Sequence, residues 1–414
     1  MFSVHNQRVR LLLTIEDMLD AFADGEILSD ENWYDMRDAL LAFNIPEQNI
    51  MFELIDSCRK DDKEIKELKK YFTRFFDAQM SAASNSSMIS EDYRNGKYGS
   101  DREFIFYIDM LRKHSVASIE EFIFIKLKDK QETEPDYYKL LTELSKGWFH
   151  EGYKVDGIGG EDNSLITNRA LILKNNTDLL EWVYENLADS ISRRSLNALI
   201  RFWLTWDYVD WRDISVYSHD VADTAVYPFY EDEVFVDSGS YIGDTVLQYV
   251  KFVNPDFKRV YTYDISAASI KHMEHNLANL SNVEIRHKGT GEENAELNMV
   301  GFDQAYHGNK LVADESDKSV DKVKVVRLDD DINEPVSFLK IDCEGYDKET
   351  LRGARNMIQR YHPKLHVDSY HKLEDLIEVP RLIREIDPSY TLYLRIPKPF
   401  SVLLRFPSIA YMAI

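Results

Sequence analysis

Hydrophobic residues recur every three or four positions through the first half of the chain. This spacing runs through residues 14–76, resumes over 101–149, and continues to about residue 206. It places apolar side chains on one face of a helix, so it is typical of amphipathic α-helices. The pattern therefore predicts a mainly α-helical N-terminal region at residues 1–165, followed by a helical lead-in over 166–230.

From Glu231 onward the pattern changes to short apolar runs separated by helical stretches. The runs read VFVD, RVYTYD, NVEIRH, VSFLKID, KLHVDSY and YTLYLRI. Alternating strands and helices are typical of a parallel sheet covered on both faces. A Pro-bearing loop joins YTLYLRI to a last run, SIAYMAI, which indicates a hairpin and an antiparallel final strand. Residues 231–414 are thus predicted to form one α/β domain.

Charge and cysteine usage narrow the expected partners. The 414-residue chain carries a formal net charge of −23, and an acidic surface repels phosphate backbones and anionic lipid. Neither nucleic acid nor a membrane surface is therefore an expected partner, and no window is apolar for long enough to span a bilayer. Cys58 and Cys343 form no CxxC pair, which fits a reducing compartment, and we expect a cytoplasmic protein.

The most informative motif is the loop DSGSYIGDT at residues 237–245, which follows a strand and opens a helix. Gly239 and Gly243 permit a tight turn and a close approach of ligand to backbone. The helix that follows points free N–H groups at the ligand, and Asp237 is placed to accept hydrogen bonds from an ammonium group. The spacing differs from the G-x-G-x-x-G of dinucleotide sites and suits a sulfonium nucleoside, S-adenosylmethionine.

The next two strands extend this predicted cofactor site. Asp264 ends the strand RVYTYD about twenty residues beyond the loop, where an acid can bind both hydroxyls of a ribose, although an ordinary solvated acid would also fit there. The loop HKGTGEE after the third strand is expected near the adenine. The predicted cofactor-binding residues are Asp237, Gly239, Tyr241, Gly243, Asp244, Thr245, Asp264, Ile265, Lys288 and Gly289.

A second motif, VSFLKIDCEGYDKETLRGA, supplies candidate catalytic groups. Asp342 stands at the carboxyl end of a predicted buried strand, where open α/β sheets bind ligands, and Glu344 follows two residues later. These acids could instead cap the helix that follows. His371 comes just after the fifth strand, on the same edge. Asp342, Glu344 and His371 are therefore the candidate general bases. A divalent metal among the three is the alternative, but no HxH or HExxH spacing supports it, and no metal is predicted.

Several of these motifs, in order and at sensible spacing, resemble the FkbM family of methyltransferases. The matching pieces are VFVDSGSYIGDT, YTYDIS, VVRLDDDI, VSFLKIDCEGYDKETLRGA, HPKLHVDSYHKLEDL, YTLYLRI and IAYMAI. The resemblance implies a Rossmann-like class I methyltransferase fold with a seven-stranded sheet whose last strand is antiparallel. It also implies S-adenosylmethionine as methyl donor and a hydroxyl oxygen as acceptor.

The resemblance also carries over to individual positions. Asp237, Gly239 and Gly243 match the family's cofactor loop, Asp264 matches its ribose acid, and Asp342 opens its D-x-E-G motif. The chain departs from the family in lacking a proline soon after the ribose acid. It also lacks a histidine that some members place after the arginine of the sixth strand. Because of these departures, the family's substrate contacts are not assigned to residues of this chain. The assignment of the cofactor site is not affected.

We therefore predict S-adenosylmethionine-dependent methyl transfer, with the hydroxyl of a sugar, glycan or other secondary metabolite as acceptor. One alternative is a non-catalytic protein that recruits a partner through its N-terminal helices, which could equally form a homo-oligomer interface. The other is a nicotinamide-dependent oxidoreductase, which the missing G-x-G-x-x-G disfavours.

Overall fold

The computed structural model describes residues 99–144, 153–208, 214, 223, 226–230, 232–253, 257–300, 310–312, 322–396 and 409–414. The chain divides into two compact units, Met1–Glu103 and Phe104–Ile414. The helices predicted over 14–76 lie outside the described residues, and the homo-oligomer interface predicted from the N-terminal helices stays a prediction.

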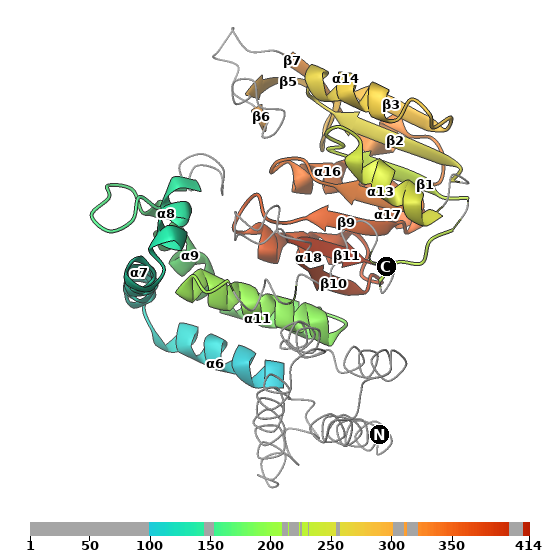
Figure 1. The fold of residues 1–414 in the computed structure, drawn as a ribbon. Helices are drawn as coiled ribbons and strands as arrows, with labels where there is room; N and C mark the ends of the chain where they lie inside the picture. Colours follow the sequence, from blue (N-terminus) through green and yellow to red (C-terminus); the bar gives the residue numbers. More distant parts are fainter. Residues whose placement is uncertain are drawn as a thin grey trace, which may run out of the picture. The chain divides into compact units, whose positions relative to one another are not determined.

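A seven-stranded sheet forms the centre of the second unit (Figure 1). Its strands are β1 (Val234–Ser238), β2 (Arg259–Asp264), β3 (Val283–His287), β8 (Phe338–Ile341), β9 (Lys364–Asp368), β10 (Leu392–Arg395) and β11 (Ala410–Ala413). Their spatial order is β10-β11-β9-β8-β1-β2-β3. β11 runs antiparallel to both neighbours, whereas the other pairs in this sheet are parallel. The predicted seven-stranded sheet with an antiparallel last strand is confirmed.

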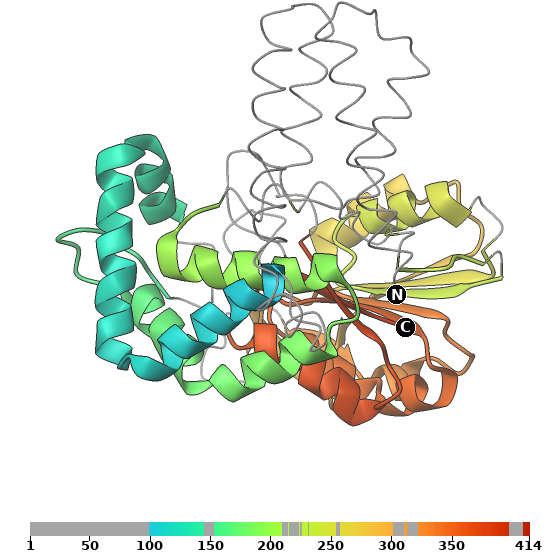
Figure 2. The same ribbon diagram turned by 90° about the horizontal axis from the view of Figure 1, so that it is seen from below.

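Helices cover both faces of this sheet, as continuous apolar strands require. On β1, Phe235 packs into one hydrophobic cluster and its neighbour Val236 into another, because successive side chains point to opposite faces. Figure 2 shows the yellow helices on one face and the orange and red helices on the other. These helices are α13 (Asp244–Val253), α14 (Ala267–Asn276), α16 (Asp347–Gly353), α17 (Arg355–Tyr361) and α18 (Asp375–Ile386).

Helices of the predicted N-terminal region and of the lead-in precede the sheet, and α11 packs against β10. These helices are α6 (Gly99–Lys113), α7 (Val116–Thr133), α8 (Pro135–Leu144), α9 (Ser164–Asn175), α10 (Thr177–Asn186) and α11 (Ser190–Thr205). Asp189 caps α11 by accepting a hydrogen bond from the Ser192 N–H, at 2.8 Å. The Ser192 hydroxyl in turn accepts the Leu394 N–H on β10. One hydrophobic cluster crosses positions 165 and 230, so these domain boundaries stay predictions.

A second, four-stranded sheet was not predicted. It consists of β4 (Gly289–Thr290), β5 (Ala295–Val300), β6 (Lys310–Val312) and β7 (Lys322–Val326), in the order β4-β7-β5-β6. Gly289 belongs to it and pairs with Val325, rather than lying in an open loop as expected. A strand as short as β4 has too few residues to show a periodicity.

None of the described helices is long and apolar enough to cross a membrane.

Candidate functional site

The glycine loop after β1 is held by hydrogen bonds to β2. The N–H groups of Gly239 and Ser240 both donate to the carbonyl oxygen of Tyr263, each at 2.9 Å. Gly239 and Gly243 have positive φ angles of 82° and 81°, as does Tyr241 at 48°. Side chains avoid this region of backbone space, so the glycines permit the turn. The predicted tight turn is thus present.

Gly239 also allows this loop to touch the strand that carries Asp342. A Cβ at position 239 would lie 1.7 Å from the carbonyl oxygen of Asp342. The two backbones meet because β1 and β8 are neighbours, with Ser238 paired to Ile341. The predicted cofactor loop and the predicted catalytic strand therefore share one edge of the sheet.

Asp237 faces an ammonium group that belongs to the chain itself. Its side chain is fully buried, and Lys340 Nζ lies 3.3 Å from its Oδ1. The same Nζ donates to the carbonyl oxygen of Gly239 at 3.2 Å and lies 3.7 Å from Asp342 Oδ2. Burial raises the pKa of Asp237 to about 6, although the charge of Lys340 opposes this shift. Direct contact of Asp237 with a cofactor ammonium stays a prediction.

Asp264 lies at the end of β2, beside the glycine loop. Its Oδ2 accepts the N–H of Tyr241 at 2.9 Å, and its Oδ1 accepts the N–H of Ser266 at 2.8 Å. Burial raises its pKa to about 6, against the effect of these backbone bonds. Each carboxylate oxygen can accept more than one hydrogen bond, so Asp264 retains acceptor capacity for the two hydroxyls of a ribose.

The remaining predicted cofactor residues fall into two groups. Asp244 and Thr245 begin α13, with Asp244 exposed and Thr245 buried. Ile265 and Lys288 follow β2 and β3, where the Ile265 carbonyl oxygen lies 3.0 Å from His287 Nε2. The ammonium of Lys288 is paired with Asp331 at 2.8 Å. The ammonium of Lys288 is thus engaged in an ion pair with Asp331. Contact of Lys288 with an adenine stays a prediction.

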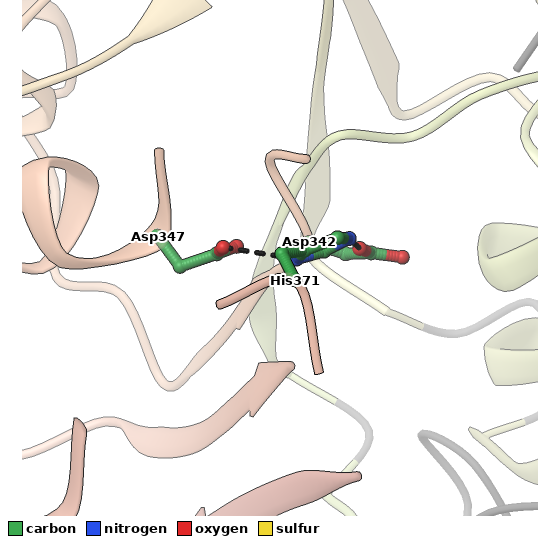
Figure 3. Close-up of side chains that lie close together, drawn as sticks. All are labelled: Asp342, Asp347 and His371. Atoms are coloured by element: carbon green, nitrogen blue, oxygen red, sulfur yellow. Dashed lines mark hydrogen bonds and ion pairs between the residues drawn. The ribbon is translucent and has the colours of Figure 1, made fainter. Parts of the chain in front are cut away.

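The three candidate catalytic residues converge on one point. His371 Nε2 lies 3.3 Å from Asp342 Oδ1 and 3.6 Å from Glu344 Oε2. His371 Nδ1 lies 3.1 Å from Asp347 Oδ2, and Figure 3 shows the imidazole between the carboxylates of Asp347 and Asp342. Residues that follow two adjacent strands, β8 and β9, are thus brought together, as their shared edge predicted.

Asp347 belongs to the candidate site, and sequence reasoning missed it. It is buried at the start of α16, and its two oxygens accept the N–H groups of Cys343 at 2.7 Å and Gly345 at 3.1 Å. These bonds fix the carboxylate that holds His371. Its position two residues after Gly345 was the available signal, but an acid in a first helical turn is also a common feature without catalytic role.

The carboxylates around His371 control its protonation. Burial alone would lower the pKa of His371. The charge and hydrogen bond of Asp347, together with the charges of Asp342 and Glu344, outweigh burial and raise the pKa to about 10. His371 therefore holds a proton at neutral pH in this arrangement and is a poor proton acceptor there.

Asp368 and Tyr370 also interact with Asp342. Burial, together with the charge of Asp342, raises the pKa of Asp368 to about 7. The Tyr370 hydroxyl donates to Asp342 Oδ1 at 3.3 Å. Both were missed, although HVDSYH places Asp368 at the end of the fifth strand and Tyr370 two residues beyond it.

Comparison with known proteins identifies the fold. The strand order with one antiparallel strand, β11, is that of a class I methyltransferase. A methyltransferase FkbM from Methylobacillus flagellatus KT superposes with a TM-score of 0.52 and 24% sequence identity, over 64% of this chain and 66% of that one. The chain therefore spans just under two thirds of that protein's length.

A family model also matches part of the sequence. Residues 237–388 match the model described as the methyltransferase FkbM domain. An rRNA methylase from Streptococcus thermophilus has 16% identity and a TM-score of 0.29, over 44% of this chain and 86% of that one. A SAM-dependent methyltransferase from Aquifex aeolicus has 14% identity and a TM-score of 0.25, over 45% and 85%. No curated protein matches this sequence.

Proposed function

We propose that this protein transfers the methyl group of S-adenosylmethionine to a hydroxyl oxygen of a sugar, glycan or other secondary metabolite. One observation carries the proposal: the loop at Gly239 touches the backbone of Asp342, so the cofactor loop adjoins the cluster around His371. The FkbM methyltransferase domain over 237–388 supports the same reaction class.

The cofactor fits the residues at this edge. The positive-φ turn at Gly239 and Gly243 leads into the start of α13, and Asp264 has acceptor capacity for ribose hydroxyls. S-adenosylmethionine supplies a methyl group already activated by its sulfonium. The protein's part is to align the acceptor oxygen with that methyl group, and orientation of this kind accounts for a large share of many rate enhancements.

The proton of the acceptor hydroxyl passes to a carboxylate in this mechanism. The side chain of Asp342 is 26% exposed and that of Glu344 39%, so both can be reached from solvent. His371 holds a proton because its pKa is raised to about 10, so its Nε2–H is available to donate a hydrogen bond to the acceptor. Asp342 or Glu344 is thus the base, and His371 positions the acceptor.

Calorimetric titration of the full chain with S-adenosylhomocysteine tests cofactor use. Binding that is weakened in Asp264→Ala and unchanged in Asp178→Ala would support the proposal, because Asp178 is an exposed acid on α10. Methyl transfer from labelled donor to a panel of glycans and nucleotide sugars then tests the acceptor class. Binding of NAD(H) without S-adenosylhomocysteine would instead favour an oxidoreductase, and cofactor binding with no acceptor methylated would favour a partner-recruiting role.

A further inference from the structure

Among the residues that the structure describes, none forms a hydrogen bond with one ring nitrogen of His371. Its side chain is 5% exposed, and within the described part of the chain Nε2 makes no hydrogen bond, whereas Nδ1 is bonded to Asp347. Leaving a buried polar atom unsatisfied is unfavourable, and native proteins contain few such atoms. Nε2 faces the carboxylates of Asp342 and Glu344. The three side chains together therefore form a candidate binding site for a ligand that would satisfy Nε2.

The donor atoms around Nε2 suit a divalent cation. Carboxylate oxygen and imidazole nitrogen are ligands of first-row divalent metals. Bonds of about 2.1 Å to a tetrahedral or octahedral ion imply separations of about 3.0–3.4 Å between adjacent donors. The observed separations from Nε2 are 3.3 Å to Asp342 and 3.6 Å to Glu344, so small side-chain adjustments would close the site.

Asp347 binds the other ring nitrogen of His371, on the side away from Asp342 and Glu344. A histidine that binds a metal usually donates its other ring N–H to a carboxylate, which fixes the ring and makes it a better ligand. The bond from His371 Nδ1 to Asp347 Oδ2, at 3.1 Å, has this form. Asp347 is itself held by the N–H groups of Cys343 and Gly345, so it is preorganised.

We propose that Asp342, Glu344 and His371 Nε2 bind a divalent cation of the Mn²⁺ or Zn²⁺ type, with Asp347 as the positioning residue. A local HxH or HExxH motif is missing because the ligands come from the ends of two different strands. The cation would take the place of the proton on Nε2. If the proposed function holds, the bound cation would contact the acceptor hydroxyl and favour its deprotonated form. Asp342, Glu344 and His371 would then act as metal ligands, in place of the base and positioning roles described for the metal-free site.

Titration of the metal-free full-length protein with MnCl₂ and with ZnCl₂ tests this site. We expect one equivalent to bind, with affinity reduced at least tenfold in His371→Gln and in Asp342→Asn. For Asp347→Asn we expect a reduction of about 10–100-fold, the usual effect of removing such a supporting carboxylate. Asp178→Asn, a change at an exposed acid on α10, should leave the affinity unchanged.

Binding of S-adenosylhomocysteine, measured on the same samples, separates this proposal from the proposed function. It should persist in the three site variants, which would show that they are folded. The absence of metal binding in protein that binds S-adenosylhomocysteine would overturn the metal site alone. Metal binding that the three substitutions do not weaken would overturn it as well. Specific metal binding without S-adenosylhomocysteine binding would leave the metal site standing and overturn the proposed function.

Discussion

The backbone of Gly239 meets that of Asp342 with no room for a side chain between them. This contact sets the distance between the cofactor loop and the carboxyl end of β8. Because the obstructing atom is a backbone oxygen in the middle of the sheet, it cannot move aside as a flexible side chain could. The geometry of the site therefore depends on glycine at position 239.

Gly239→Ala should destabilise the protein by more than about 3 kcal/mol, since it adds a backbone clash to a strained positive φ. Thermal or denaturant unfolding measures the change. Gly159→Ala is a matched control, because Gly159 has a φ of 79° but no atom within 4 Å of the added Cβ. It should cost about 1 kcal/mol. Equal effects of the two substitutions would contradict the proposed contact.

Asp264→Ala should weaken binding of S-adenosylhomocysteine by about 1.5–3 kcal/mol, as expected for hydrogen bonds to a charged group. The carboxylate also accepts the Tyr241 N–H, so part of the loss would come from a less ordered loop. Calorimetry gives the affinity, and circular dichroism checks the fold. An unchanged affinity would remove Asp264 from the cofactor site.

The same affinity should depend on pH through Asp264. Burial raises its pKa to about 6, so the carboxyl becomes protonated as the pH falls below that value and loses acceptor capacity. Affinity should therefore decrease from about pH 7 to pH 5. Asp264→Asn should reduce this dependence, with the remainder due to Asp237, whose pKa burial also raises to about 6. The same steep decrease in the variant would show that another group controls binding.

Much of the main sheet could be predicted because its strands are short apolar runs separated by helices. β8 and β9 are buried along their whole length, and such runs are visible without knowledge of their partners. The small sheet could not be predicted in this way. β4 has two residues and obtains its hydrogen bonds from β7, which is distant in sequence, so only tertiary pairing defines it.

For the candidate site, sequence reasoning found the groups but not their interactions. Asp342 and His371 were placed on one edge by the rule for parallel sheets, and the structure brings them within 3.3 Å. The pairing of Asp237 with Lys340, and of His371 with Asp347, depends on side-chain directions inside the fold. The raised pKa of His371 follows from those pairings, so no linear pattern could reveal it.

Arg169 on α9 provides a prediction outside the site. Its side chain is completely buried, and within the described residues its three guanidinium nitrogens make no hydrogen bond. The guanidinium carbon lies 4.3 Å from the ring centre of Trp206 and 5.0 Å from that of Phe202. Such contacts offset only part of the cost of burying a charge, and burial lowers the pKa of Arg169 to about 9.

Arg169→Met should therefore raise the free energy of unfolding at neutral pH by about 1–3 kcal/mol. A pKa below that of the unfolded chain means that the folded state disfavours the charged form. This cost is fully present below about pH 9 and decreases as the pH rises further. Chemical denaturation of the variant and wild type measures it. Arg112→Met is the control, because Arg112 forms exposed ion pairs with Asp178 and Glu181, whose loss should change stability by at most about 1 kcal/mol. Marked destabilisation by Arg169→Met would show that the buried guanidinium is a net stabilising group.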